Sequence, residues 1–374
     1  MQIIERTHKL EYFGSRILDK YLGGLRMAVL DIETLGLYPK HEPVILVGLM
    51  SVAEDGTAVS RQFFAESASA EEETALLEAV SNELASYDYL LTYNGRRFDI
   101  PYLKVRAEKL GVSGLVRQLD MFNLDLFMFV KYYSALPHFL PNLKQKSIEE
   151  YLGLKLSRDD EISGGESVIL YQELEKLNAM EIASELSKLT GSGAENALIN
   201  DVDTADIDAK KAAITEKILL HNHDDLVQLY KILPVIMETA IHIGFNKQGF
   251  PVAGVCGWPN LNVKKIKLSA SSFAVSGVYV PTACKSSQSA DPATSDKALD
   301  TDDNFSFTSF STPERPYNVH FDPDGSFMLE IPSFAAVLEA TASSEGTGEG
   351  LDLRAQNELA AMLLTRFMHD NPLT

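Results

Sequence analysis

The sequence predicts an α/β protein in which a mixed β-sheet is flanked by helices and followed by a small β-rich C-terminal region. Three observations lead to this fold class: a β-hairpin pattern comes first, strand patterns then alternate with helical ones, and short alternating strands take over after residue 244. The chain of 374 residues, of which 45% are hydrophobic and 23% charged, is long enough for one large or two medium globular domains.

The first two thirds of the chain carry the patterns of this sheet and its helices. Met27–Leu30 is a short apolar run typical of a buried strand, and the turn sequence Glu54–Gly56 joins two further strand patterns into a hairpin. Apolar residues at helical spacing, and stop signals such as Gly111, predict the helices. The predicted strands are 27–30, 43–53, 59–65 and 89–93, and the predicted helices are 71–87, 99–110, 124–133, 147–151, 166–186 and 212–239, the last with a kink at Pro234.

The C-terminal third has a different character. Its alternating segments predict short strands, and the turn sequence Asp322–Gly325 predicts a hairpin. The predicted strands are 261–269, 272–279, 317–321 and 326–331, followed by a terminal helix over 353–369. We therefore expect an N-terminal extension (1–26), a main domain (27–244) with an inserted loop (187–208), and a β-rich appendage (245–374) with a disordered loop (283–315).

Composition indicates a soluble, cytoplasmic protein. No run of about 18 apolar residues is present, so we expect no membrane-spanning helix and no membrane partner. The N-terminus lacks the pattern of a signal peptide. Two cysteines, Cys256 and Cys284, are too few for a disulfide framework and lack zinc-type spacing.

The net charge of −20 argues at first against a nucleic-acid partner. One stretch departs from this balance, because nine basic residues stand against four acidic ones between Thr92 and Lys146. Solvated helix faces explain most charge clusters, but this one surrounds an unusual acidic motif. The basic residues are Arg96, Arg97, Lys104, Arg106, Lys109, Arg117, Lys131, Lys144 and Lys146.

Carboxylates occur in three places where a packed strand or helix is expected. Asp31 and Glu33 are two apart on a strand and share a face, whereas His221 and Asp225 are one turn apart on a helix. Asp99 opens a helix, where an aspartate is also an ordinary N-cap. Carboxylates placed side by side repel unless a cation lies between them, and Mg²⁺ and Mn²⁺ prefer such oxygen ligands. Together the patches predict a site for divalent cations.

Residues 27–233 resemble the DEDD-type 3′–5′ exonucleases of the ribonuclease H-like superfamily, and are most similar to the bacterial YprB-like group within it. The resemblance rests on an ordered set of short motifs. They are Asp31-Ile32-Glu33-Thr34-x-Gly36, Tyr93-Asn94-Gly95-Arg96-Arg97-Phe98-Asp99-Ile100-Pro101-Tyr102-Leu103, His221-Asn222-His223-Asp224-Asp225-Leu226, and the segments Leu140–Lys144 and Arg158–Gly164.

The resemblance implies a ribonuclease H-like sheet and two Mg²⁺ or Mn²⁺ ions. The implied metal ligands are Asp31, Glu33, Asp99 and Asp225, with Asp224 as the alternative last ligand, and the implied general base is His221. This histidine stands four residues before Asp225, although histidine-type members of the family usually place it five before. Thr34, Asn94, Phe98 and Lys144 would contact the substrate, Lys146 is a further candidate phosphate contact, and Asp125 is expected to have a structural role at the start of a helix.

The function implied is a metal-dependent 3′–5′ exonuclease that hydrolyses phosphodiester bonds of single-stranded nucleic acid by a two-metal mechanism. The motifs do not distinguish DNA from RNA and name no protein partner. A non-catalytic nucleic-acid or protein-binding module on the same fold is the main alternative. A metallohydrolase that acts on small phosphorylated molecules is a third reading.

Overall fold

A computed structural model describes residues 1–154, 162, 164–190, 204–269, 272–279, 318–322, 325–332 and 351–373, with backbone alone for 184–190 and 204–205. The described chain divides into two compact units. Unit 1 consists of residues 1–14, 26–119 and 123–239, and unit 2 of residues 15–25, 120–122 and those from 240 onward.

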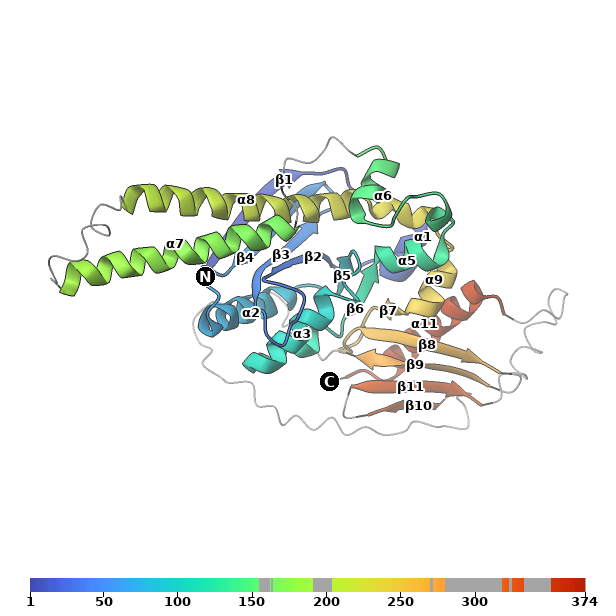
Figure 1. Cartoon of the computed structure of the whole chain (residues 1–374). Coiled ribbons are helices and arrows are strands. Elements are labelled where there is room, and N and C mark those ends of the chain that lie inside the picture. Colours follow the sequence, from blue (N-terminus) through green and yellow to red (C-terminus); the bar gives the residue numbers. More distant parts are fainter. Residues whose placement is uncertain are drawn as a thin grey trace. The chain divides into compact units, whose positions relative to one another are not determined.

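Unit 1 is built on a six-stranded mixed sheet, as the fold class predicted (Figure 1). Four strands at one side run antiparallel, and β2 pairs with β5 in parallel. The order is β1 (Gln2–Lys9), β4 (Thr57–Phe64), β3 (Val44–Val52), β2 (Met27–Thr34), β5 (Tyr89–Thr92) and β6 (Phe122–Asp125). The β3–β4 hairpin is confirmed, and Gly56 at its turn has the positive φ of 80° that glycine permits. The edge strand β1 was not predicted.

The helices of unit 1 largely follow the predicted ones. They are α2 (Ala70–Leu84), α3 (Asp99–Leu110), α4 (Ser113–Gln118), α5 (Leu126–Tyr133), α6 (Gln145–Tyr151), α7 (Gly164–Thr190) and α8 (Thr204–Lys231), with 3₁₀ turns η1 (Leu136–His138) and η2 (Leu233–Glu238). Three predictions need correction. The helix predicted from 212 begins at Thr204. The helix predicted from 124 begins at Leu126, because the preceding residues form β6, and Pro234 lies in η2 rather than at a kink, because a proline cannot continue the hydrogen-bond ladder of α8.

The long helix α8 packs across the sheet and contacts β2, β3, β4 and β5. Helix α7 runs beside it (Figure 1). Tyr171 of α7 packs with Phe64 and Ile218 in the buried core, and its hydroxyl donates to the carbonyl of Ala65 at 2.8 Å. Residues 191–203, the interior of the predicted insertion, lie outside the described residues. The packing fixes the C-terminal half of α8 over the sheet.

Unit 2 contains a second, separate sheet, which confirms the β-rich C-terminal region. Its order is β10 (Asn318–Phe321), β11 (Ser326–Ile331), β9 (Phe273–Tyr279), β8 (Leu261–Leu268) and β7 (Phe250–Val252), all antiparallel. Helices α1 (Arg16–Leu22), α9 (Ile241–Gln248) and α11 (Leu353–Asp370) complete the unit, and the Tyr21 and Phe245 rings stack at 4.0 Å. The segment predicted to be disordered, 283–315, lies outside the described residues.

Candidate active site

Four of the carboxylates singled out from the sequence converge in unit 1. Asp31 and Glu33 project from β2, Asp99 is the first residue of α3, and Asp225 lies on α8. The pKa of Asp31 is raised well above its usual range, first by burial and then by the charges of Asp225, Asp99 and Glu33. Each of the other three carboxylates is therefore close enough to act on Asp31, as a shared cation site requires.

Asp99 does not cap its helix. Phe98 occupies the N-cap position of α3, and the Asp99 carboxyl instead accepts a hydrogen bond from the backbone N–H of Ile32 in β2. Burial raises the pKa of Asp99 to about 7, and the charge of Asp125 adds to the increase. The contact with β2 places Asp99 between the side chains of the first motif.

His221 lies between two of these carboxylates. Its Nε2 is 3.7 Å from Oε1 of Glu33 and 3.7 Å from Oδ2 of Asp225. One ligand atom from each of the three residues lies within 4.8 Å of the others, so the group could hold a metal ion, and His221 could be a ligand as well as a base. Asp224 is buried on the same helix but is not part of this group. Of the two neighbouring aspartates, only Asp225 belongs to this group.

Asp31, Glu33, His221 and Asp225 line a cleft of about 670 Å³, whereas Asp99 is not among the described residues that line it. Several predicted substrate contacts lie on its walls. The lining residues are Asp31, Ile32, Glu33, Thr34, Gly36, Leu37, Phe98, Lys144, Gln145, Lys146, Gly164, Gly165, Val168, His221 and Asp225. An aromatic ring and two lysines thus lie beside the carboxylates, which is the mixture of groups that a nucleotide needs. Of the Arg158–Gly164 motif, only Ile162 and Gly164 are among the described residues.

The backbone conformation of Asn94 is unusual, and its role toward substrate stays a prediction. Within the described part of the chain, Asn94 is not among the residues that line the cleft. Its φ of 64° puts it in the left-handed region, which asparagine tolerates better than most residues, and its backbone N–H donates to Asp125 Oδ1 at 2.8 Å. Asp125 also accepts from the backbone N–H groups of Arg96 and Met128. Asp125 therefore has the structural role expected of it, as the N-cap of α5 and the anchor of the loop before α3.

Two buried amides orient Asp31, and the sequence did not single out either of them. Asn222 Nδ2 donates to Asp31 Oδ2 at 2.8 Å, and Gln62 Nε2 donates to Asn222 Oδ1 at 2.9 Å. Gln62 is held in turn by the carbonyl of Leu219 and by Arg6. Both amides are fully buried. The position of Asn222 beside His221 was an available signal, whereas Gln62 belongs to an ordinary strand pattern.

Gly48 makes room for this arrangement. It pairs with Asp31 on one side and with Gln62 on the other, in the middle of β3. A Cβ at position 48 would lie 2.2 Å from Asn222 Oδ1 and 2.8 Å from a methyl group of Leu226. The missing side chain therefore allows α8 to approach the sheet closely enough for Asn222 to reach Asp31.

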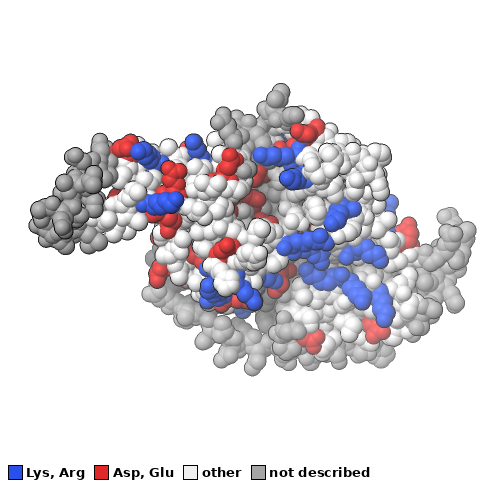
Figure 2. Space-filling view, in the orientation of Figure 1, with Lys and Arg blue, Asp and Glu red and all other residues white. Residues whose placement is uncertain are grey.

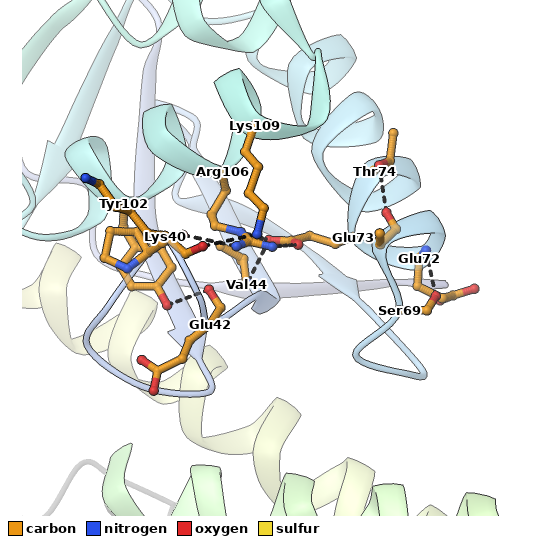
Figure 3. Close-up of polar contacts among 12 residues, drawn as sticks. Lys40, Glu42, Val44, Ser69, Glu72, Glu73, Thr74, Tyr102, Arg106 and Lys109 are labelled. Atoms are coloured by element: carbon orange, nitrogen blue, oxygen red, sulfur yellow. Dashed lines mark hydrogen bonds and ion pairs between the residues drawn. The ribbon is translucent and has the colours of Figure 1, made fainter.

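The loop between β2 and β3 forms one wall of the cleft, where Gly36 and Leu37 lie. Helix α3 holds this loop with three side chains on one face (Figure 3). The Tyr102 hydroxyl hydrogen-bonds the carbonyl oxygens of Gly36 and Glu42 at 3.1 and 2.9 Å. Lys109 Nζ donates to the carbonyl oxygen of Lys40 at 3.1 Å.

A buried ion pair between Arg106 of α3 and Glu73 of α2 also holds the loop between β2 and β3. Arg106 Nε donates to Glu73 Oε1 at 2.7 Å, and a second Arg106 nitrogen pairs with the other carboxylate oxygen (Figure 3). Arg106 also donates to the carbonyl of Pro39, and Glu73 accepts the backbone N–H of Val44 at 2.9 Å. The middle of the loop and the first residue of β3 are thereby tied to a buried ion pair.

Comparison with known proteins agrees with this architecture. Residues 28–187 match a family model described as RNase_H superfamily. No curated protein sequence matches the chain.

Three solved structures illustrate the similarity. The family B DNA polymerase of the archaeon Pyrobaculum calidifontis is 15% identical over 92% of this chain and 46% of its own, with a TM-score of 0.35. E. coli exonuclease I in complex with a dT13 oligonucleotide is 13% identical, over 68% and 55% of the two chains, with a TM-score of 0.29. The zinc-bound E. coli exonuclease I–ssDNA complex is 13% identical, over 45% of each chain, with a TM-score of 0.29. The chain thus spans about half the length of these structures. The family match and the six-stranded mixed sheet flanked by helices identify an RNase H-like domain in this chain.

Proposed function

We propose that the protein is a metal-dependent 3′–5′ exonuclease that hydrolyses phosphodiester bonds of single-stranded nucleic acid by a two-metal mechanism. One observation carries the proposal: three carboxylates from β2 and α8 line a cleft that also presents an aromatic ring and two lysines, and a fourth, Asp99 of α3, is close enough for its charge to act on Asp31. The RNase H-like domain and the motif resemblance point to the same chemistry.

The donor set fits Mg²⁺ or Mn²⁺. Asp31, Glu33, Asp99 and Asp225 offer hard oxygen ligands, and their mutual repulsion is the property that a bound cation relieves. Bound ions would supply Lewis-acid stabilisation of the attacking and departing oxygens of the phosphodiester. Without a cation, burying these carboxylates lowers the stability of the folded state, and a bound cation would offset that cost.

The remaining residues would position substrate and move a proton. His221 Nε2, held between Glu33 and Asp225, would accept the proton of the attacking water. Phe98 would stack against the terminal base, and Lys144 and Lys146 would contact phosphates. Thr34, whose hydroxyl donates to the carbonyl of Gly36 at 2.7 Å, would shape the wall beside the sugar. Asn94 would act through the loop that carries Phe98.

The first test is cleavage of 5′-labelled single-stranded DNA and RNA with Mg²⁺, Mn²⁺ or EDTA. We expect a ladder that shortens from the 3′ end, depends on the metal and shows which sugar is preferred. An absence of cleavage of both polymers with either metal would contradict the proposal and favour the binding module.

We expect Asn222→Ala to lower the affinity of the site for metal ions while leaving the carboxylate ligands in place. The change removes the hydrogen bond that orients Asp31 and leaves Gln62 Nε2 without its Asn222 acceptor. Supporting contacts to metal ligands are typically worth about 10- to 100-fold in metal affinity. Titration calorimetry with Mn²⁺ measures the loss, and Asn178→Ala on α7, whose amide donates to the carbonyl of Glu66 on the surface, is the matched control. Equal affinities in the two variants would contradict the assignment.

The stability of the metal-free protein should fall as the pH rises from about 4 to about 7. The folded state raises the pKa of Asp99 to about 7, so within this window it holds a proton that the unfolded chain has lost. The expected decrease is about 1.4 kcal/mol for each pH unit between the two pKa values. Thermal melting in EDTA measures it; Mg²⁺ should restore stability above this window and have little effect below it. Asp99→Asn should make this decline shallower, and the raised pKa of Asp31 should account for the decline that remains.

A further inference from the structure

Two cations rest on aromatic rings at the exposed side of α5. The guanidinium of Arg97 lies 5.9 Å from the centre of the Tyr132 ring and donates to the Tyr132 hydroxyl at 2.7 Å. Lys131 Nζ lies 5.3 Å from the ring centres of both Phe127 and Tyr132. Tyr132 is 47% exposed. We call these four residues the aromatic–basic surface.

The charge balance makes this surface unusual. In a chain with 53 acidic and 33 basic residues, four other arginines of unit 1 (Arg6, Arg26, Arg61 and Arg106) are paired with carboxylates. Among the residues that the structure describes, no carboxylate forms an ion pair with Arg97 or Lys131. Figure 2 shows a few Lys and Arg side chains among uncharged ones over the part of the molecule where Figure 1 places α5. The surface thus keeps positive charge available to an anion.

The aromatic–basic surface adjoins the cleft at two points. Arg97 directly precedes Phe98, which lines the cleft. On the other side, the Tyr93 ring packs edge-on against Phe127 at 5.8 Å, and its hydroxyl donates to the carbonyl of Leu143 at 2.7 Å. The next residue, Lys144, is again part of the cleft wall. The aromatic–basic surface is thus joined to the cleft wall on two sides, through Arg97 next to Phe98 and through Tyr93 next to the segment of Lys144.

We propose that the aromatic–basic surface binds the single-stranded nucleic acid that runs away from the cleft, with a base stacked on Tyr132 and phosphates at Arg97 and Lys131. This inference rests on the proposed function, to which it adds a binding site for nucleotides that are not cleaved. Alternating rings and cations suit a strand whose bases present flat faces and whose phosphates are spaced along it. The hydrogen bond to Arg97 fixes the Tyr132 ring in place for stacking.

The test compares a long oligonucleotide with a small nucleotide ester that is too short to extend beyond the cleft. Binding of a long labelled oligothymidylate or oligouridylate is measured by fluorescence anisotropy in EDTA, and hydrolysis of thymidine 5′-p-nitrophenyl phosphate, which occupies only the cleft, is measured with Mn²⁺. Tyr132→Ala should weaken oligonucleotide binding about tenfold, the loss of one stacked base, and leave hydrolysis of the small ester unchanged. Tyr132→Phe keeps the ring and should retain most of the affinity.

Salt dependence separates the cations from the ring. Arg97→Ala and Lys131→Ala should each reduce the slope of log affinity against log salt by about 0.7, the value for one phosphate contact of a single strand. Lys217→Ala, an exposed lysine on α8, is the control and should leave the slope unchanged.

The outcomes distinguish this inference from the proposed function. Unchanged oligonucleotide affinity in Tyr132→Ala, Arg97→Ala and Lys131→Ala would overturn the inference and leave the surface to a protein partner. Equal losses on the oligonucleotide and the small ester would also overturn it, because the residues would then only support the cleft. If the unaltered protein binds the oligonucleotide but hydrolyses neither substrate with any metal, the proposed function fails while the binding surface stands.

Discussion

Asp31→Asn is expected to reduce metal-dependent cleavage by about a thousandfold or more while leaving the protein folded. Metal stabilisation of a phosphodiester transition state is worth several kcal/mol, and each 1.4 kcal/mol is about tenfold in rate. The amide oxygen of the new asparagine can still accept the hydrogen bond from Asn222, so the local structure has little reason to change. Single-turnover cleavage of a labelled oligonucleotide measures the loss.

The same variant should be more stable than the unaltered protein when metal is absent. Asp31 is destabilised by burial and by the neighbouring Asp225, Asp99 and Glu33, and a neutral amide removes that repulsion. Thermal melting should therefore show a higher midpoint in EDTA and a smaller response to Mn²⁺.

A comparison of Asp224→Asn with Asp225→Asn tests which aspartate is the last ligand. Only Asp225→Asn should abolish cleavage, and the reverse result would assign the last ligand to Asp224 instead. Full activity in Asp31→Asn would refute the site.

Among these substitutions, breaking the buried Glu73–Arg106 ion pair should cause the largest loss in the free energy of unfolding. Glu73→Gln leaves the Arg106 charge in a place that water does not reach, and loss of one partner of such a pair costs about 3 to 5 kcal/mol. Urea denaturation measures the free energy of unfolding. Because the pair holds the carbonyl of Pro39 and the N–H of Val44, cleavage should also weaken as the loop loosens.

A matched change on the same helix separates burial from charge. Glu83→Gln removes the partly exposed pair with Arg61, which should cost less than about 1 kcal/mol. Replacing both members of the buried pair by apolar residues, as in Glu73→Leu with Arg106→Met, should cost less than Glu73→Gln alone, because no charge is left without a partner. A similar cost for Glu73→Gln and Glu83→Gln would mean that water enters the buried site on mutation.

Local patterns in the sequence were sufficient for much of the fold. The hairpin around Gly56, the helix that ends at Gly111 and the terminal helix α11 each carry their signals within a few residues, and the structure confirms all three. The candidate site was predictable for a related reason. Carboxylates in a strand or helix conflict with burial, and that conflict is visible without knowing the partners. Their roles as ligands and base stay predictions.

Contacts between distant segments could not be read in the same way. Gln62 and Asn222 are 160 residues apart, and no sequence pattern near either residue predicts their contact. Strand β1 joins the sheet only through β4, and α1 belongs to unit 2 although it lies near the N-terminus. Asn94 was assigned to the substrate by its motif, whereas the structure shows that its backbone conformation already explains an asparagine there. In each case the deciding information is tertiary.

The glycine at position 48 also limits which substitutions the sequence can accept during evolution. Gly48 leaves space that the Asn222 amide fills, so a larger residue at one position demands a smaller one at the other. Among natural relatives that keep the four carboxylates, substitutions at these two positions should therefore be correlated, although they lie far apart in sequence. A relative with alanine at position 48 would carry a residue shorter than asparagine at position 222 and would have to orient its first aspartate by another group.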